Sequence, residues 1–213
     1  LVMATNHAIT ERRRRDHIVD LENMLNALNG KLESLPAKDK AGRTRIATLI
    51  STLEKRLYLY EGGPSGNGPS GAIIANSTGC SSVYASTFPF NAYNDPWVNS
   101  LFQDAQPLAK GIFEGISAQA VGDMRAMRLA RLELDDAYDP AQHDEALRFL
   151  SWSTFTPEEI RLLPTVMTIG GDGATYDIGF GALSRILASD TPLKVLVLNT
   201  GAYSNTGGQA STS

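Results

Sequence analysis

The chain has 213 residues and a formal net charge of −4; 42% of its residues are hydrophobic and 20% are charged. This near-average composition is typical of a folded domain and excludes fibrous and disordered classes. The single cysteine excludes an internal disulfide, and the mild acidity gives no general attraction to nucleic acid. No apolar run reaches the roughly 20 residues that span a bilayer. Since a lone cysteine also fits a reducing compartment, we expect a cytoplasmic protein with neither nucleic acid nor a membrane as partner.

The N-terminal part of the chain carries a helical pattern. Apolar side chains recur at alternating spacings of three and four, first over residues 18–35 and again over residues 46–60. A short polar breaker at residues 36–42 separates the two runs. Two such stripes joined by a turn predict an antiparallel helical hairpin over residues 10–60.

A stretch rich in glycine, proline and serine follows at residues 61–71. It comes after a helical pattern and before a strand-like segment, whereas a phosphate-binding loop follows a strand and precedes a helix. We therefore interpret residues 61–71 as a linker.

From residue 72 onward the pattern changes to alternating strands and helices. Short apolar runs predict strands at residues 72–75, 165–169 and 193–198. Helical patterns occupy residues 107–134, 140–150, 157–163 and 177–188. Strands that are apolar throughout suit a parallel sheet buried on both faces. The sequence thus predicts an α/β fold with a doubly wound, mostly parallel sheet.

Two of the predicted strands end in polar, glycine-rich turns. Asp172 lies between Gly171 and Gly173, and Thr200 follows it by 28 residues, just after the last strand. That spacing allows one crossover helix and a return strand, so both turns should meet at one edge of the sheet, where ligands bind. An aspartate would repel a bare phosphate but can hold one through a divalent cation. The two turns predict a magnesium–phosphate site.

This pair of turns resembles the magnesium–thiamine diphosphate motif of thiamine-dependent enzymes. The wording GDGATYDIGFG at 171–181 and YSNTGGQA at 203–210 closely resembles the pyruvate:ferredoxin (flavodoxin) oxidoreductase family. IANSTGCSSVY at 74–84 and PWVNSLFQD at 96–104 agree with it. The matches cover about residues 72–113 and 163–213. The hairpin and residues 115–161 resemble insertions in longer bacterial members.

The resemblance implies a partial thiamine diphosphate-binding fold and a set of site residues. Asp172, the Thr200 hydroxyl and the Ala202 carbonyl would bind Mg²⁺. Asn205 would be the catalytic residue that reaches the reacting carbon, and Cys80 would be one ligand of a [4Fe–4S] cluster. The full set implied in cofactor binding is Gly171, Asp172, Gly173, Ala174, Thr200, Gly201, Ala202, Tyr203, Ser204, Asn205 and Cys80.

The resemblance also implies a reaction. A 2-oxoacid, pyruvate foremost, would be oxidatively decarboxylated to acyl-coenzyme A and CO₂, and electrons would pass through iron–sulfur clusters to ferredoxin or flavodoxin. Such a cluster needs four cysteines, and the family's activating glutamate lies in another domain. We therefore expect residues 1–213 to be part of the thiamine diphosphate-binding domain of a larger, homodimeric polypeptide, and to be inactive alone.

Two alternatives remain open from the sequence. One is a non-redox thiamine enzyme, a decarboxylase or synthase, which Cys80 would distinguish from the redox enzymes. The other is a non-catalytic interaction module that binds a partner through the hairpin. His7, His17 and His143 lie in helical zones without further ligands at metal spacing, so we assign them surface or packing roles.

Overall fold

The computed structural model describes residues 1–77, 79, 93–100, 104–203 and 206–212. The chain divides into two compact units. The first, helical unit consists of residues 1–69 and 117–163, and the second, sheet unit consists of residues 70–116 and 164–213. The long helix α4 (Ala105–Leu134) contributes its first part to the sheet unit and the rest to the helical unit.

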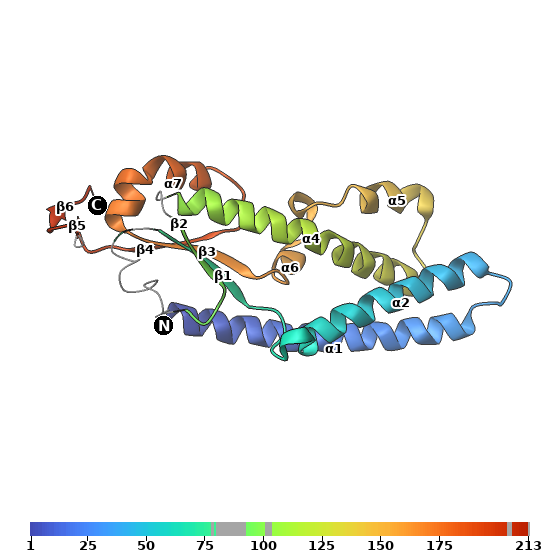
Figure 1. The fold of residues 1–213 in the computed structure, drawn as a ribbon. Helices are drawn as coiled ribbons and strands as arrows, with labels where there is room; N and C mark the ends of the chain where they lie inside the picture. The colour runs from blue at the N-terminus through green and yellow to red at the C-terminus, as the bar shows by residue number, and fades with distance from the viewer. Residues whose placement is uncertain (78, 80–92, 101–103, 204–205, 213) are drawn as a thin grey trace. The chain divides into compact units, whose positions relative to one another are not determined.

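The helical unit begins with the predicted hairpin, formed by α1 (Val2–Ser34) and α2 (Lys40–Glu61). Helix α1 begins at Val2 (Figure 1), whereas the apolar stripe predicts a hairpin that begins at residue 10. The carboxylate of Asp39 caps α2 by accepting a hydrogen bond from the Gly42 N–H over 2.9 Å. The seam between the two helices is formed by buried aliphatic side chains from both: Leu21, Leu25, Leu28, Ile46, Leu49, Ile50 and Leu53.

Three further helical segments complete this unit. They are the second part of α4, α5 (Pro140–Arg148) and the short α6 (Pro157–Ile160). Single 3₁₀ turns lie at Gly63–Ser65 and Trp152–Thr154. From α4, the side chains of Met124, Met127 and Ala130 are buried. No helix in the described parts of the chain is both long and apolar enough to cross a membrane.

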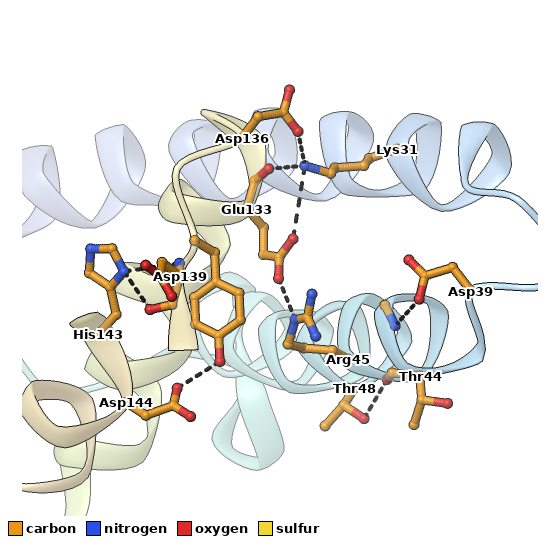
Figure 2. Close-up of polar contacts among 12 residues, drawn as sticks. Lys31, Asp39, Thr44, Arg45, Thr48, Glu133, Asp136, Asp139, His143 and Asp144 are labelled. Atoms are coloured by element: carbon orange, nitrogen blue, oxygen red, sulfur yellow. Dashed lines mark hydrogen bonds and ion pairs between the residues drawn. The ribbon is translucent and has the colours of Figure 1, made fainter. Parts of the chain in front are cut away.

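A buried carboxylate of α4 links this helix to both arms of the hairpin (Figure 2). Glu133 is 6% exposed and pairs with Arg45 of α2. Lys31 of α1 donates to the Glu133 backbone carbonyl and to Asp136 Oδ1, the latter over 2.7 Å, and its Nζ lies 3.9 Å from the Glu133 carboxylate. Two cations from two helices thus hold one buried acid.

A second polar network lies inside the helical unit around Arg56 of α2. This guanidinium is 4% exposed, donates to His17 Nε2 over 2.9 Å, and pairs with Asp123 of α4 over 2.6 Å. It also donates to the hydroxyl of Tyr60, which in turn donates to the backbone carbonyl of Leu162 over 2.9 Å. The apolar stripe gave no sign that an arginine lies inside this helix bundle.

The sheet unit is built on a four-stranded parallel sheet in the order β2-β1-β3-β4 (Figure 1). Its strands are β1 (Ala72–Ser77), β2 (Trp97–Ser100), β3 (Thr165–Gly171) and β4 (Lys194–Leu198). The central strands β1 and β3 are almost fully buried. The predicted α/β class with a parallel sheet is confirmed.

Three features of the sheet unit differ from the sequence expectation. The clearest apolar run, β4, is only half-buried because it lies at the edge of the sheet with one neighbouring strand. Strand β2 was not predicted. The single helix expected at 177–188 is a π-helical turn, η3 (Gly173–Ile178), followed by α7 (Phe180–Leu187), with Gly179 between them.

Candidate functional site

Parallel pairing of β3 and β4 brings the two glycine-rich turns to one edge of the sheet. Gly171, the last residue of β3, is in register with Leu198, the last residue of β4. Asp172 immediately follows β3, and Thr200 comes two residues after the end of β4. The common edge expected from the spacing is therefore present, and it is the carboxyl edge, where α/β sheets bind ligands.

Three oxygen atoms from the two turns converge at this edge. The Thr200 hydroxyl oxygen lies 3.5 Å from Asp172 Oδ1, at the outer limit of a hydrogen bond, and donates to the Ala202 carbonyl oxygen over 3.0 Å. These are the three atoms that the family resemblance assigns to Mg²⁺. A carboxylate, a hydroxyl and a carbonyl are hard oxygen donors, which suit this ion. The residues present thus fit a magnesium site.

Asp172 is buried but ionised. It is 2% exposed, and its Oδ2 accepts a hydrogen bond from the Ser211 hydroxyl over 2.9 Å. Burial favours the neutral acid, but the Ser211 hydroxyl and the backbone N–H groups of residues 172, 173 and 202 outweigh it, so the pKa of Asp172 is lowered. At neutral pH the site therefore offers a charged ligand.

The second turn contains a left-handed backbone conformation at Gly201. Gly201 has φ +71°, and its N–H donates to the Asn199 side-chain carbonyl over 2.9 Å. This left-handed conformation strains other residues. The chain then forms a small antiparallel ribbon of β5 (Ala202–Tyr203) and β6 (Gln209–Ala210).

The Tyr203 ring closes over the first turn. A Cβ atom on Gly173 would lie 2.4 Å from the nearest ring carbon, so only glycine leaves room for this ring. The Tyr203 hydroxyl donates to Asp177 Oδ2 over 2.6 Å. That contact raises the pKa of Tyr203 to about 12. The two turns are therefore in direct contact.

The structure brings together most of the cofactor-binding residues named from the sequence, from Gly171 to Ala174 and from Thr200 to Tyr203. Cys80, Ser204 and Asn205 lie outside the described residues, so their assignments stay predictions. Sequence reasoning gave no role to Asp177 or Ser211. Two features of the sequence could have indicated them. Asp177 is a second carboxylate within the GDGATYDIGFG motif, and Ser211 begins a hydroxyl-rich run after the YSNTGGQA motif.

The three histidines belong to the helical unit. His17 is buried in the helical unit, and His143 lies beside Asp139 there. Across the described stretches, no three His, Cys, Asp or Glu side chains gather as a metal cluster. The candidate site instead relies on one carboxylate with neutral oxygen donors.

The sequence of the chain is similar to those of known proteins. Residues 160–213 match the family described as thiamine pyrophosphate enzyme, C-terminal TPP binding domain. The chain is 32% identical over 221 residues to a probable pyruvate-flavodoxin oxidoreductase of Escherichia coli, with 84% of this chain and 18% of that protein covered. It is 34% identical over 174 residues to the pyruvate-flavodoxin oxidoreductase of Trichormus variabilis, covering 65% and 15%.

The name of a third relative contains ferredoxin in place of flavodoxin. The pyruvate:ferredoxin oxidoreductase of Moorella thermoacetica is 32% identical over 177 residues, which cover 65% of this chain and 15% of that protein. The chain thus spans less than a fifth of the length of these relatives. The resemblance seen in the sequence is confirmed: the chain is related to the pyruvate:ferredoxin (flavodoxin) oxidoreductase family through a segment that includes part of its thiamine diphosphate-binding domain.

Proposed function

We propose that the sheet unit binds Mg²⁺–thiamine diphosphate at the carboxyl edge of β3 and β4. The observation that carries this proposal is the convergence of the Asp172 carboxylate, the Thr200 hydroxyl and the Ala202 carbonyl at that edge. Asp172, Thr200 and Ala202 would hold the metal. Gly171 to Ala174 and Thr200 to Asn205 would surround the diphosphate.

We further propose that the chain serves a 2-oxoacid:ferredoxin or flavodoxin oxidoreductase of the EC 1.2.7 type, with pyruvate as substrate and acyl-coenzyme A and CO₂ as products. When bound, thiamine diphosphate supplies the carbon nucleophile and the electron sink for decarboxylation. The chain's own part is to anchor the cofactor. Ionised Asp172 would balance part of the charge of Mg²⁺, and burial of this carboxylate at 2% exposure limits competition from water.

Two finer roles belong to this proposal. Asn205 would contact the reacting carbon and the bound 2-oxoacid, and Cys80 would give one thiolate to a [4Fe–4S] cluster. The names of the relatives favour the redox reading over a non-redox thiamine enzyme. Iron–sulfur spectroscopy of the polypeptide that carries this segment tests it. Loss of cluster absorbance in Cys80→Ser supports the redox reading, and an unchanged spectrum contradicts it.

The remaining partners follow from the same reading. Coenzyme A, a ferredoxin or flavodoxin, further domains of one polypeptide and a second copy of it would complete the active protein, in the cytoplasm. We propose residues 1–213 as part of the thiamine diphosphate-binding domain, with residues 10–60 as an inserted hairpin and 61–71 as its linker. The segment alone would not turn over substrate.

Calorimetric titration of thiamine diphosphate in the presence and absence of Mg²⁺ tests the central claim. Wild-type protein should bind only with Mg²⁺, and Asp172→Ala should lose binding. Thr200→Val removes one oxygen and should weaken binding about tenfold. Asp190→Ala, an exposed carboxylate after α7, is the matched control. Equal binding by wild type and Asp172→Ala would remove the assignment.

A further inference from the structure

Asp177, a residue of η3, accepts a hydrogen bond from Tyr203 of the second turn. We propose that Asp177, acting through Tyr203, is a positioning residue that holds the second turn against Asp172 and thereby sets the Mg²⁺ affinity of the site. The inference rests on the proposed function, because it concerns the same site. We call the three residues Asp177, Tyr203 and Thr212 the latch.

Both carboxylate oxygens of Asp177 take part in the latch. Oδ2 accepts from the Tyr203 hydroxyl over 2.6 Å. Oδ1 accepts from the Thr212 N–H over 3.2 Å and from the Thr212 hydroxyl. Tyr203 lies in β5, and Thr212 follows β6 by two residues. One side chain therefore contacts strand β5 of the ribbon and the segment just after β6.

The latch is connected directly to the candidate metal ligands. The Ala202 carbonyl belongs to the peptide unit that joins Ala202 to Tyr203, so a displacement of Tyr203 moves this oxygen. Thr200 donates to the same carbonyl over 3.0 Å and would move with it. On the other side, Asp177 is five residues from Asp172 within the π-helical turn. The latch thus connects the Thr200 and Ala202 oxygens of the second turn to the segment that carries the Asp172 carboxylate.

Apart from the Tyr203 ring against Gly173, packing does little to fix the described residues of the second turn. Thr200, Gly201 and residues 206–210 are exposed, and β5 is only half-buried. A ribbon of two short strands has little stability of its own. Hydrogen bonds to a charged carboxylate are about twice as strong as neutral ones. The latch and the Ser211–Asp172 hydrogen bond therefore connect this exposed turn to the first one.

The experiment compares wild type, Asp177→Asn, Tyr203→Phe and the double variant in Mg²⁺-dependent thiamine diphosphate binding. Each single variant should raise the Mg²⁺ concentration for half-maximal binding about tenfold. At saturating Mg²⁺ the cofactor affinity should return to within about twofold of wild type, because the ion restores the oxygen geometry. The double variant should be no worse than Asp177→Asn, since Tyr203→Phe removes only the hydrogen bond to Tyr203 that Asp177→Asn already weakens. Tyr176→Phe, in the same π-helical turn, should match wild type.

Hydrogen exchange without ligands gives an independent readout. Amides of residues 200–212 should exchange faster in Asp177→Asn and Tyr203→Phe, whereas those of β1 and β3 should not change. An unchanged Mg²⁺ dependence, additive effects, or a loss of affinity that saturating Mg²⁺ does not restore would each overturn the inference. Faster exchange in a protein whose wild type binds no thiamine diphosphate would instead overturn the proposed function and leave the latch as a structural contact.

Discussion

Arg56 donates a hydrogen bond from Nε to the Nε2 atom of His17 over 2.9 Å, and each of these two side chains is 4% exposed. An imidazole nitrogen accepts a hydrogen bond only when it carries no proton. Burial, followed by the positive charges of Arg56 and Arg131, lowers the pKa of His17 to about 3. The core of the helical unit therefore holds His17 as the neutral imidazole.

This pKa makes the stability of the chain depend on pH. Between pH 6.5 and pH 3 the unfolded chain binds a proton at His17 that the folded chain does not. The free energy of unfolding should therefore fall as the pH falls across this window, by up to about 1.4 kcal/mol per pH unit. His17→Gln keeps an acceptor but does not titrate, so urea unfolding should show a shallower pH slope. His7→Gln, on the exposed face of α1, should keep the wild-type slope. Equal slopes for wild type and His17→Gln would contradict the assignment.

Glu133 should be important for stability because two cations surround it in a buried position. Glu133→Gln leaves Arg45 without its carboxylate partner, and Lys31 keeps Asp136 and the backbone carbonyl of residue 133. Because the Arg45 side chain is 34% exposed, water offsets part of the loss, and we expect a cost of about 1–3 kcal/mol in urea unfolding. Glu158→Gln breaks an exposed ion pair with Arg161 and should leave the midpoint unchanged. Equal midpoints for the two variants would show that the buried contact adds nothing.

The Arg128–Glu159 pair gives a second prediction in which acid lowers the stability of the wild type. Glu159 is 3% exposed and accepts two hydrogen bonds from Arg128, over 2.7 and 2.6 Å. Burial works against ionisation, but these hydrogen bonds and that of the Thr156 N–H lower the pKa of Glu159. Arg128→Met should cost about 3 kcal/mol at pH 7.

The deficit of Arg128→Met should shrink below about pH 4.5, the unfolded-state pKa of glutamate. There, wild type loses the stabilisation from its ionised Glu159, while the variant can neutralise the unpaired acid. Denaturant unfolding at pH 7 and pH 4 measures both values, with the exposed Arg161→Met as control. A deficit that grows on acidification would rule out this explanation.

Two neighbouring glycines offer a matched pair at the candidate site. A Cβ atom on Gly173 would collide with the Tyr203 ring, whereas a Cβ atom on Gly171 meets nothing within 4 Å. Gly173→Ala should therefore displace the ring, break the Tyr203–Asp177 hydrogen bond and lower the free energy of unfolding by about 1–3 kcal/mol. Gly171→Ala should stay within about 0.5 kcal/mol of wild type. Thermal unfolding checks both, and equal losses would mean that the ring does not occupy this space.

The sequence was informative where a structure depends on neighbouring residues or on sheet topology. The runs that became β1, β3 and β4 are apolar over several consecutive positions, so each could be recognised by itself. The proximity of Asp172 and Thr200 followed from parallel pairing, because consecutive parallel strands place their carboxyl ends together. These inferences needed no knowledge of side-chain contacts.

Long-range polar contacts could not be predicted in the same way. Arg56 and His17 are 39 residues apart, and each looks like a surface residue until the helices pack. Strand β2 has only four residues, two of them polar, so it has no strand pattern of its own. The β5–β6 ribbon is shorter still and is held by Asp177, which belongs to another segment.

The π-helical winding of η3 makes the length of the chain between Asp172 and Asp177 critical. Each residue of a regular helix turns the chain by about 100° around the axis. Deleting one residue from 174–176 would therefore rotate Asp177 away from Tyr203 without changing a single contacting side chain. A substitution at residues 174–176 leaves this spacing intact, whereas an insertion or deletion there would separate the two turns of the candidate site at once. Alignments of this segment with its relatives should accordingly contain no gap between these two aspartates.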